Sequence, residues 1–203
     1  MTKLKPAFYL QPDVTEVARL LLGKTLVTRI DGVRTSGIIV ETEAYAGAID
    51  RASHAWDNRR TKRTEVMYQP GGLAYVYLCY GIHYLFNVVT NVRDVPHAVL
   101  VRALEPVEHI ELMQARCRHK NASRITAGPG ILSKAMGITA AMDGASLSGQ
   151  QIWIEDAPPL PAAMIVSGAR VGVQYAGEDA YLPYRFWVKD NPWVSKGKGL
   201  ERP

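Results

Sequence analysis

The segment Glu41-Thr-Glu-Ala-Tyr45 places two carboxylates and a tyrosine at alternating positions along the chain. The preceding Gly37-Ile-Ile-Val40 is rich in β-branched residues, which predicts a strand that continues through the segment. Side chains on a strand alternate between its two faces, so Glu41, Glu43 and Tyr45 should share one face. Carboxylates are costly to bury without a purpose. The pattern therefore indicates an active site in which one carboxylate acts as a base beneath an aromatic ring.

A tyrosine-rich segment, Leu73-Ala-Tyr-Val-Tyr-Leu-Cys-Tyr-Gly81, supplies further aromatic rings. As a strand it would place Tyr75 and Tyr77 on one face, an arrangement that plain packing also explains. Tyr80 falls beside a glycine at the predicted turn, where an exposed ring could insert into a stack of bases. Asn87 lies among apolar residues of the return strand. It is either a satisfied structural amide or a group that contacts the edge of a base.

Residues 47–65 form a polar stretch that we expect to be a basic loop or a short helix. The cations of this stretch are Arg51, Arg59, Arg60, Lys62 and Arg63. A net charge of +5 is compatible with a polyanionic partner, although many soluble proteins are mildly basic. The same stretch contains His54, which is either a solvated or structural histidine or part of a binding site.

Length and composition restrict the class of protein. A chain of 203 residues fits one domain, and 47% apolar with 21% charged residues is ordinary for a soluble globular protein. The sequence has no apolar run of membrane-spanning length, and its first residues lack the features of a signal peptide. Cys79 and Cys117 form no CxxC motif, which favours a reducing cytoplasm without disulfides. No spacing of ligands in the sequence predicts a metal site or a cofactor.

The order of the expected elements predicts an α+β fold. Apolar spacing predicts helices over 13–23, 105–118 and 130–136. Runs of β-branched and aromatic residues predict strands over 24–30, 34–45, 73–79, 83–90, 99–103, 151–155, 169–173 and 184–188. The strands at 73–79 and 83–90 should form a hairpin with residues 80–82 at its tip.

Several separate blocks of the chain together resemble one known family. The blocks are Glu41-Thr-Glu-Ala-Tyr45, Ser53-His54, Tyr75-Val-Tyr-Leu-Cys-Tyr-Gly81, Asn87, Val101-Arg-Ala-Leu-Glu-Pro106, Gly128-Pro129 and Asn191-Pro-Trp-Val-Ser195. In this order and spacing they closely resemble the alkyladenine (3-methylpurine) DNA glycosylases, the mammalian-type 3-methyladenine DNA glycosylase family. The resemblance covers nearly the whole chain. It implies one domain, residues 1–203, in which a curved antiparallel sheet carries a protruding hairpin and is surrounded by helices.

The resemblance also implies a role for each matched residue. Glu43 is the general base that activates the attacking water, and Arg102 and the backbone carbonyl of Val171 help to hold that water. The residues that sandwich the flipped base are Tyr45, His54 and Tyr77. Tyr80 fills the gap that the base leaves in the duplex. Asn87 disfavours guanine by crowding its 2-amino group, whereas Glu41 has no assigned catalytic role.

The implied activity is hydrolysis of the N-glycosidic bond of alkylated or deaminated purines in double-stranded DNA, which starts base excision repair. Expected substrates are 3-methyladenine and hypoxanthine, with ethenoadenine and 7-methylguanine as further candidates. No lysine falls at a matched catalytic position, so we expect a monofunctional enzyme that leaves the abasic strand intact. It should act as a cytoplasmic monomer, associated with the nucleoid if the source is bacterial. Phosphate contacts are expected from the basic loop, at Arg59, Arg60, Lys62 and Arg63.

Three other interpretations of the residues stay open. Glu41 and Glu43, about 7 Å apart along a strand, could be the paired carboxylates of a sugar glycosidase, which would release reducing sugar. A non-catalytic module that binds damaged DNA or structured RNA would keep the tyrosines and the basic loop but would release no free base. A structural protein would have no site at all.

Overall fold

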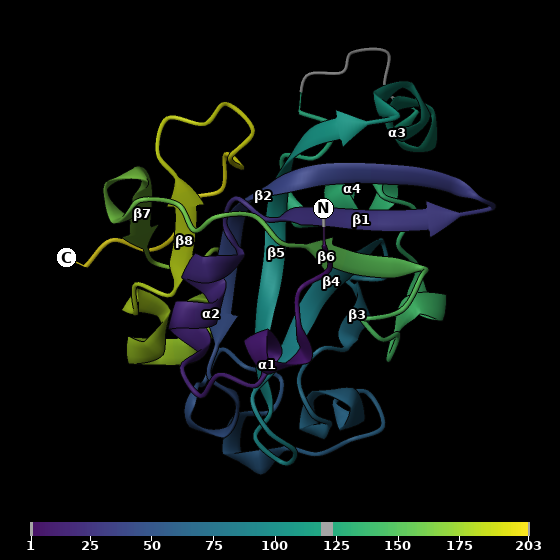
Figure 1. Cartoon of the computed structure of the whole chain (residues 1–203). Helices are drawn as coiled ribbons and strands as arrows, with labels where there is room; N and C mark the ends of the chain where they lie inside the picture. The colour runs from purple at the N-terminus through teal and green to yellow at the C-terminus, as the bar shows by residue number, and fades with distance from the viewer. Residues whose placement is uncertain (1, 119–123, 203) are drawn as a thin grey trace.

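The computed structural model describes residues 2–118 and 124–202 and contains one eight-stranded antiparallel sheet. The sheet follows the order β3-β4-β5-β2-β1-β6, and β8 pairs with β2 and β7. The strands are β1 (Thr25–Ile30), β2 (Val33–Tyr45), β3 (Ala74–Cys79), β4 (His83–Thr90), β5 (His97–Glu108), β6 (Ile152–Glu155), β7 (Ile165–Gly168) and β8 (Arg185–Val188). The sheet is strongly curled and helices lie around it (Figure 1), which confirms the α+β fold expected from the sequence.

Four short α-helices pack around the sheet: α1 (Pro6–Tyr9), α2 (Val14–Leu21), α3 (Ile110–Cys117) and α4 (Pro129–Ala135). The helix α2 begins where the carboxylate of Asp13 accepts the backbone N–H groups of Thr15 and Glu16, and it ends before Gly23, whose φ is +84°. It packs against β2, while α4 packs against β4 and β5. None of the helices in the described residues has both the length and the apolar character that a membrane span needs.

The long strand β2 changes partner halfway along its length. Its first half pairs with β1 on one side, whereas Glu41 to Glu43 pair with β8 on that side and with β5 on the other. In the pairing with β5, Glu41 lies opposite Ala103 and Thr42 lies opposite Val101. Arg102 therefore has no partner directly opposite it, an irregularity of the kind that redirects a side chain. The carboxylate segment is thus held by strands on both sides, next to a bulged arginine.

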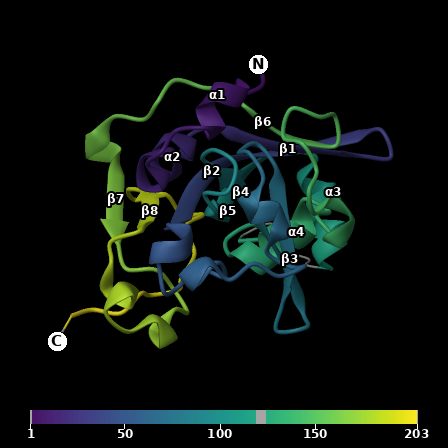
Figure 2. The same cartoon turned by 90° about the horizontal axis from the view of Figure 1, so that it is seen from below.

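The hairpin of β3 and β4 is confirmed, with Cys79 opposite His83 and residues 80–82 at the tip. Tyr80 and Gly81 both have positive φ angles, 49° and 70°. A positive φ is uncommon for a residue as bulky as tyrosine. The side chain of Tyr80 is 91% exposed, and the hairpin projects from the body of the molecule (Figure 2).

Two elements differ from the sequence prediction. Residues 105–108 continue β5 and pair with β2, so the predicted helix 105–118 begins only at Ile110. Residues 169–173 are a loop, and the strand lies just before them at Ile165–Gly168. The remaining predicted strands and helices are present with boundaries shifted by a few residues, and the polar stretch is a loop with short 3-10 turns, Gly47–Ile49, Trp56–Asn58 and Glu65–Tyr68.

Candidate active site

Glu43 lies in the second half of β2 and has no exposed surface. Its Oε1 accepts the backbone N–H of Val171 at 2.7 Å and lies 3.2 Å from Nη1 of Arg102. Its Oε2 accepts the hydroxyl hydrogen of Tyr45 at 2.8 Å. Oε2 accepts this one hydrogen bond within the described residues, and because a carboxylate oxygen can accept at least two, it keeps a position for another donor. That position could receive a proton from a water molecule.

The second carboxylate, Glu41, accepts hydrogen bonds from residues that are distant in the sequence. Its Oε1 accepts from Nε of Arg102 at 2.7 Å, Nε of Arg185 at 2.8 Å and Oγ of Ser195 at 2.9 Å. Its Oε2 accepts the backbone N–H of Ser195 at 2.7 Å. With these donors around it Glu41 is poorly placed to be the second carboxylate of a sugar glycosidase, and it instead positions its arginine partners.

Arg102 joins the two carboxylates, since its Nε contacts Glu41 and its Nη1 contacts Glu43. Burial alone would lower the pKa of Arg102, but the charges of Glu43 and Glu41 outweigh burial and raise this pKa. The guanidinium therefore stays charged. It lies in the wall of the groove described below, directly beside the carboxylate of Glu43.

Tyr45 is fixed from two directions. Its hydroxyl donates to Glu43, and the guanidinium of Arg170 lies 4.8 Å from its ring centroid. Burial, and then the charge of Glu43, raise the pKa of Tyr45 well above its ordinary value. Tyr45 consequently keeps its proton and remains a hydrogen-bond donor to Glu43.

A buried ion pair between Asp50 and Arg170 holds the Arg170 guanidinium against the ring of Tyr45. The two side chains form a two-point contact, with Nη2 of Arg170 2.8 Å from Oδ1 of Asp50. Asp50 also accepts two backbone N–H groups of the turn that follows β2, each at 3.0 Å. The pair therefore ties the loop that contains Val171 to the turn that leads to His54.

The aromatic residues expected to hold a base lie together. The rings of His54 and Tyr77 are edge to face, with their centroids 4.7 Å apart, and Tyr75 lies 5.3 Å from Tyr77. Tyr45, His54 and Tyr77 border a space of about 40 Å³ together with Asn87. A space of that size holds about one water molecule, so it must widen before a purine can enter. Asn87 is held in place because its Nδ2 donates to the backbone carbonyl of Tyr75 at 3.1 Å.

An open groove of about 870 Å³ runs beside this aromatic cluster. Predicted site residues in its wall are Tyr45, His54, Arg63, Tyr77, Tyr80, Arg102 and Val171. Glu43 lies beneath the wall, bonded to three of these residues. Val171 reaches Glu43 through its backbone N–H, while the role expected for its carbonyl stays a prediction.

The four cations predicted to contact DNA have different surroundings. Arg60 binds Glu65 at 2.7 Å and Asp94 at 2.9 Å, so its charge is already paired. The guanidinium of Arg63 lies 4.7 Å from the ring centroid of Tyr77. Arg59 lines a separate hollow beside His54, and Lys62 is exposed to solvent.

His54 is neutral in this setting. Burial, and then the positive charges of Arg63 and Arg59, lower the pKa of His54 from 6.5 to about 4. Nη2 of Arg63 lies 3.4 Å from Nε2 of His54 and can only donate, so Nε2 is the acceptor. Nδ1 then carries the hydrogen and donates to the hydroxyl of Tyr75 at 2.8 Å.

We expect an NMR titration to give His54 a pKa near 4 and Arg63→Gln to raise it toward 6.5, because a neighbouring charge is removed. A histidine whose pKa falls on folding contributes stability that is complete above pH 6.5 and is lost as the pH falls from 6.5 toward 4. In Arg60→Gln, whose cation is already paired, the His54 pKa should stay low. A wild-type value near 6.5 would show that His54 is solvated.

Sequence reasoning missed several residues on which the site depends. Asp50 and Arg170 form the buried pair, Arg185 completes the Glu41 cluster, and Tyr175 lies in the wall of the groove. Only the position of Arg170 next to Val171 could have suggested one of them. The other contacts join segments that are far apart in the chain.

Comparison with known proteins gives the family. Residues 7–192 match the methylpurine-DNA glycosylase (MPG) family. A Bacillus cytotoxicus protein named "Putative 3-methyladenine DNA glycosylase" is 42% identical over 207 residues, which cover 96% of this chain and 100% of the relative. Relatives with the same name come from Alkaliphilus oremlandii, 44% identical over 96% of this chain and 99% of the relative, and from Chlamydia abortus, 45% identical over 90% and 96%. The chain therefore belongs to the methylpurine-DNA glycosylase family and is a DNA glycosylase, which confirms the resemblance seen in its sequence.

Proposed function

We propose that the protein flips alkylated or deaminated purines out of duplex DNA and hydrolyses their N-glycosidic bond with a water activated by Glu43. The observation that carries the proposal is a buried carboxylate held by Tyr45, Arg102 and Val171 beneath a groove lined with aromatic rings. The proposed substrates are 3-methyladenine and hypoxanthine, with ethenoadenine and 7-methylguanine as further candidates. The product would be an intact strand with an abasic site, which starts base excision repair.

In the proposed reaction the water oxygen bonds to the sugar C1′ and the bond from C1′ to the purine breaks. The water gives one proton to Glu43 and keeps the other in the new hydroxyl of C1′. The bonding electron pair leaves with the base, so cationic 3-methyladenine leaves as a neutral molecule, whereas hypoxanthine leaves as an anion that takes a proton from solvent. The carboxylate also stabilises the positive charge that develops on the sugar. Arg102 and the carbonyl of Val171 would hold the water, which fits their position in the groove wall next to Glu43.

Aromatic stacking offsets the free energy of flipping. Extracting a base from duplex DNA costs a few kcal/mol, least for a damaged base. Stacking on an aromatic ring returns about 1–3 kcal/mol per base. Tyr45 and Tyr77 would also attract 3-methyladenine through its positive charge. An arginine already lies against each ring, Arg170 4.8 Å from the Tyr45 centroid and Arg63 4.7 Å from the Tyr77 centroid, so neither ring is favoured over the other as a cation partner.

Tyr80→Ala should slow excision from paired duplex by about tenfold or more, because stacking contributes about 1–3 kcal/mol. Tyr80 is held at a positive φ on a projecting tip, and such strained conformations cluster at functional sites. A ring there would fill the gap in the duplex and stabilise the flipped state. The loss should be smaller for a lesion in single-stranded or mismatched DNA, which needs less unstacking.

Single-turnover excision from paired and mismatched duplexes measures the effect of Tyr80→Ala. Tyr80→Phe keeps the ring and should behave almost as the wild type. An equal loss in paired and mismatched DNA would show that Tyr80 does not act as a wedge.

Incubation with alkylated DNA tests the proposed function directly. We expect chromatography to find free 3-methyladenine in the supernatant, and the DNA strand to break only after treatment with alkali. Release of no free purine from alkylated or hypoxanthine-containing duplex would contradict the proposal, and strand cleavage without alkali would contradict the monofunctional reaction.

A further inference from the structure

Residues 195–199, which we call the flanking segment, come after β8 and contact both residues that are proposed to hold the attacking water. Lys196 and Lys198 of this segment are exposed to solvent. They alternate with residues that are partly buried against the active site, which are Ser195, Gly197 and Gly199. The segment therefore presents one hydroxyl and two stretches of bare backbone to the site.

Ser195 is bound to the carboxylate of Glu41 at two points. Its backbone N–H donates to Oε2 of Glu41 at 2.7 Å, and its hydroxyl donates to Oε1 at 2.9 Å. Because the hydroxyl hydrogen is used in this bond, Oγ of Ser195 is left as an acceptor. Nη2 of Arg102 lies 3.4 Å from that oxygen. Ser195 thus contacts both members of the pair formed by Glu41 and Arg102.

The guanidinium of Arg102 is held at each of its three nitrogen atoms. Nε donates to Glu41 at 2.7 Å, Nη2 faces Ser195, and Nη1 lies 3.2 Å from Oε1 of Glu43. A guanidinium is planar and rigid, so fixing Nε and Nη2 determines the direction of Nη1. Nη1 carries two hydrogens and can donate to Glu43 and to a water at the same time. Ser195 therefore helps to decide where Arg102 would hold a water.

Gly197 packs between Arg102 and Val171 with backbone alone. A Cβ atom added at Gly197 would lie 2.9 Å from Cγ1 of Val171 and 3.4 Å from Nη2 of Arg102. The carbonyl of Gly197 accepts from Nη1 of Arg185 at 2.8 Å, which holds this part of the segment in place. A valine side chain has one strongly preferred rotamer and cannot easily turn away. A side chain at Gly197 would therefore displace Val171 or Arg102.

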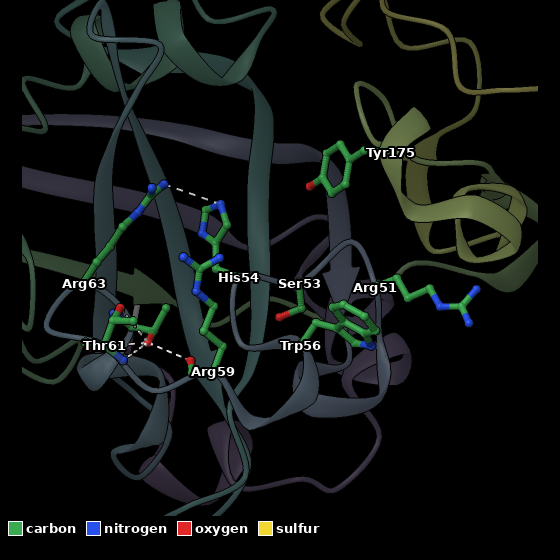
Figure 3. Close-up of a pocket in the computed structure, with 9 residues that line it drawn as sticks. Arg51, Ser53, His54, Trp56, Arg59, Thr61, Arg63 and Tyr175 are labelled. Carbon is green, nitrogen blue, oxygen red and sulfur yellow. Dashed lines mark hydrogen bonds between the residues drawn. The ribbon is translucent and has the colours of Figure 1, made fainter.

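The loop of residues 169–173 is contacted at a second point. A Cβ atom at Gly199 would overlap the backbone carbonyl of Ala169. The loop carries Val171, whose N–H donates to Glu43 at 2.7 Å. It leads directly into the 3-10 helix η6 (Gln174–Tyr181), from which the ring of Tyr175 points toward His54 (Figure 3). A shift of the flanking segment would thus reach the residues on which the proposed reaction depends.

We propose that the flanking segment sets the position of the attacking water, with Ser195 orienting Arg102 and Gly197 holding Val171 beside it. This inference rests on the proposed function, because it assumes that Arg102 and Val171 hold that water. Neither Ser195 nor Gly197 lines the groove or the aromatic space. Both are positioning residues, so their replacement should slow the chemical step and leave lesion binding unchanged.

Gly197→Ala tests the contact with Val171. We expect a single-turnover excision rate about tenfold to 10²-fold lower, since a misplacement of about 1 Å can cost about 10²-fold. Affinity for a duplex whose 2′-fluorinated lesion nucleotide resists hydrolysis should stay within about twofold of the wild type. Lys198→Ala is the matched control, because it changes an exposed side chain of the same segment, and it should keep the wild-type rate.

A pair of substitutions at Ser195 separates positioning from folding. Ser195→Ala keeps the backbone bond to Glu41 but removes the oxygen beside Nη2 of Arg102, and it should lower the rate about tenfold. Ser195→Thr keeps the hydroxyl and should recover most of that loss. At saturating enzyme the rate constant does not depend on the fraction of folded protein, so a change in stability alone would leave it unchanged.

Three results would overturn the inference: a wild-type rate in Gly197→Ala, a loss of lesion affinity with no loss of rate at saturation, or equal rates in Ser195→Ala and Ser195→Thr. The serine pair decides the matter if Gly197→Ala does not fold. If the wild type releases no free purine from damaged DNA, the proposed function fails and this inference fails with it. Normal purine release by the wild type together with any of the three results contradicts the inference alone.

Discussion

We expect Glu43→Gln to keep binding to lesion DNA and to lose base excision, with a single-turnover rate at least about 10²-fold lower. The glutamine side chain can fit in one orientation. Its carbonyl oxygen must take the place of Oε1, which accepts from Val171 and faces Arg102. Its amide nitrogen then takes the place of Oε2 and faces the hydroxyl of Tyr45, which can turn to accept. The position that received the water proton now carries a donor, so the water cannot be activated.

The measurement is single-turnover excision with saturating enzyme, together with binding to the same duplex. Glu41→Gln is the matched control, since it changes a second buried carboxylate of the same strand. It should lower the rate clearly less than Glu43→Gln. It should, however, lower thermal stability, because Arg185 loses its carboxylate partner and Arg102 keeps only Glu43. Near-wild-type excision by Glu43→Gln would rule out Glu43 as the base.

The parts of the site that lie within one β-strand or one β-hairpin were predictable from the sequence. The two-residue alternation of β2 correctly placed Tyr45 next to Glu43, and the tyrosine-rich hairpin was found with its tip at Tyr80. These predictions worked because period and turn chemistry are local properties of the chain. The family resemblance added Arg102 and Val171, which the structure indeed brings to Glu43.

The two incorrect elements depend on contacts with distant segments. Glu105 and Glu108 are compatible with a helix and Pro106 is tolerated in its first turn, but pairing with the first half of β2 keeps residues 105–108 extended. Residues 169–173 resemble a strand, yet Arg170 turns inward to Asp50 and the N–H of Val171 bonds to Glu43 rather than to a neighbouring strand. In both places tertiary contacts override local propensity, and such contacts cannot be derived from one sequence.

The supporting residues were missed for the same reason. The hydrogen-bond donors to Glu41 are Arg102, Arg185 and Ser195, and all three are far from Glu41 in the sequence. An isolated arginine or aspartate in the sequence most often indicates a solvated surface charge. Only the fold shows that these charges are buried in pairs, and that the pairs hold the residues that face the groove.

The buried pair of Asp50 and Arg170 should have the largest effect on stability. Arg170 has no exposed side-chain surface and Asp50 has 1%. Removing one member of a buried pair leaves the other charge without compensation, which typically costs about 3–5 kcal/mol of unfolding free energy. Asp50→Asn should show a loss of this size, since the unpaired guanidinium stays buried against Tyr45 and Tyr184. That loss is a large share of the roughly 5–15 kcal/mol by which domains are stable.

Urea unfolding measures this effect, as a lower midpoint with an unchanged slope. Asp94→Asn is the matched control, because it removes a carboxylate from an exposed arginine and should change the midpoint very little. The double variant Asp50→Asn/Arg170→Leu should be less destabilised than the sum of its single variants, since no buried charge is left alone. Additive losses, or an Asp50→Asn variant as stable as Asp94→Asn, would show that the pair does not act as a unit. Because Arg170 precedes the residue that donates its N–H to Glu43, folded Asp50→Asn should also excise purines more slowly than the wild type.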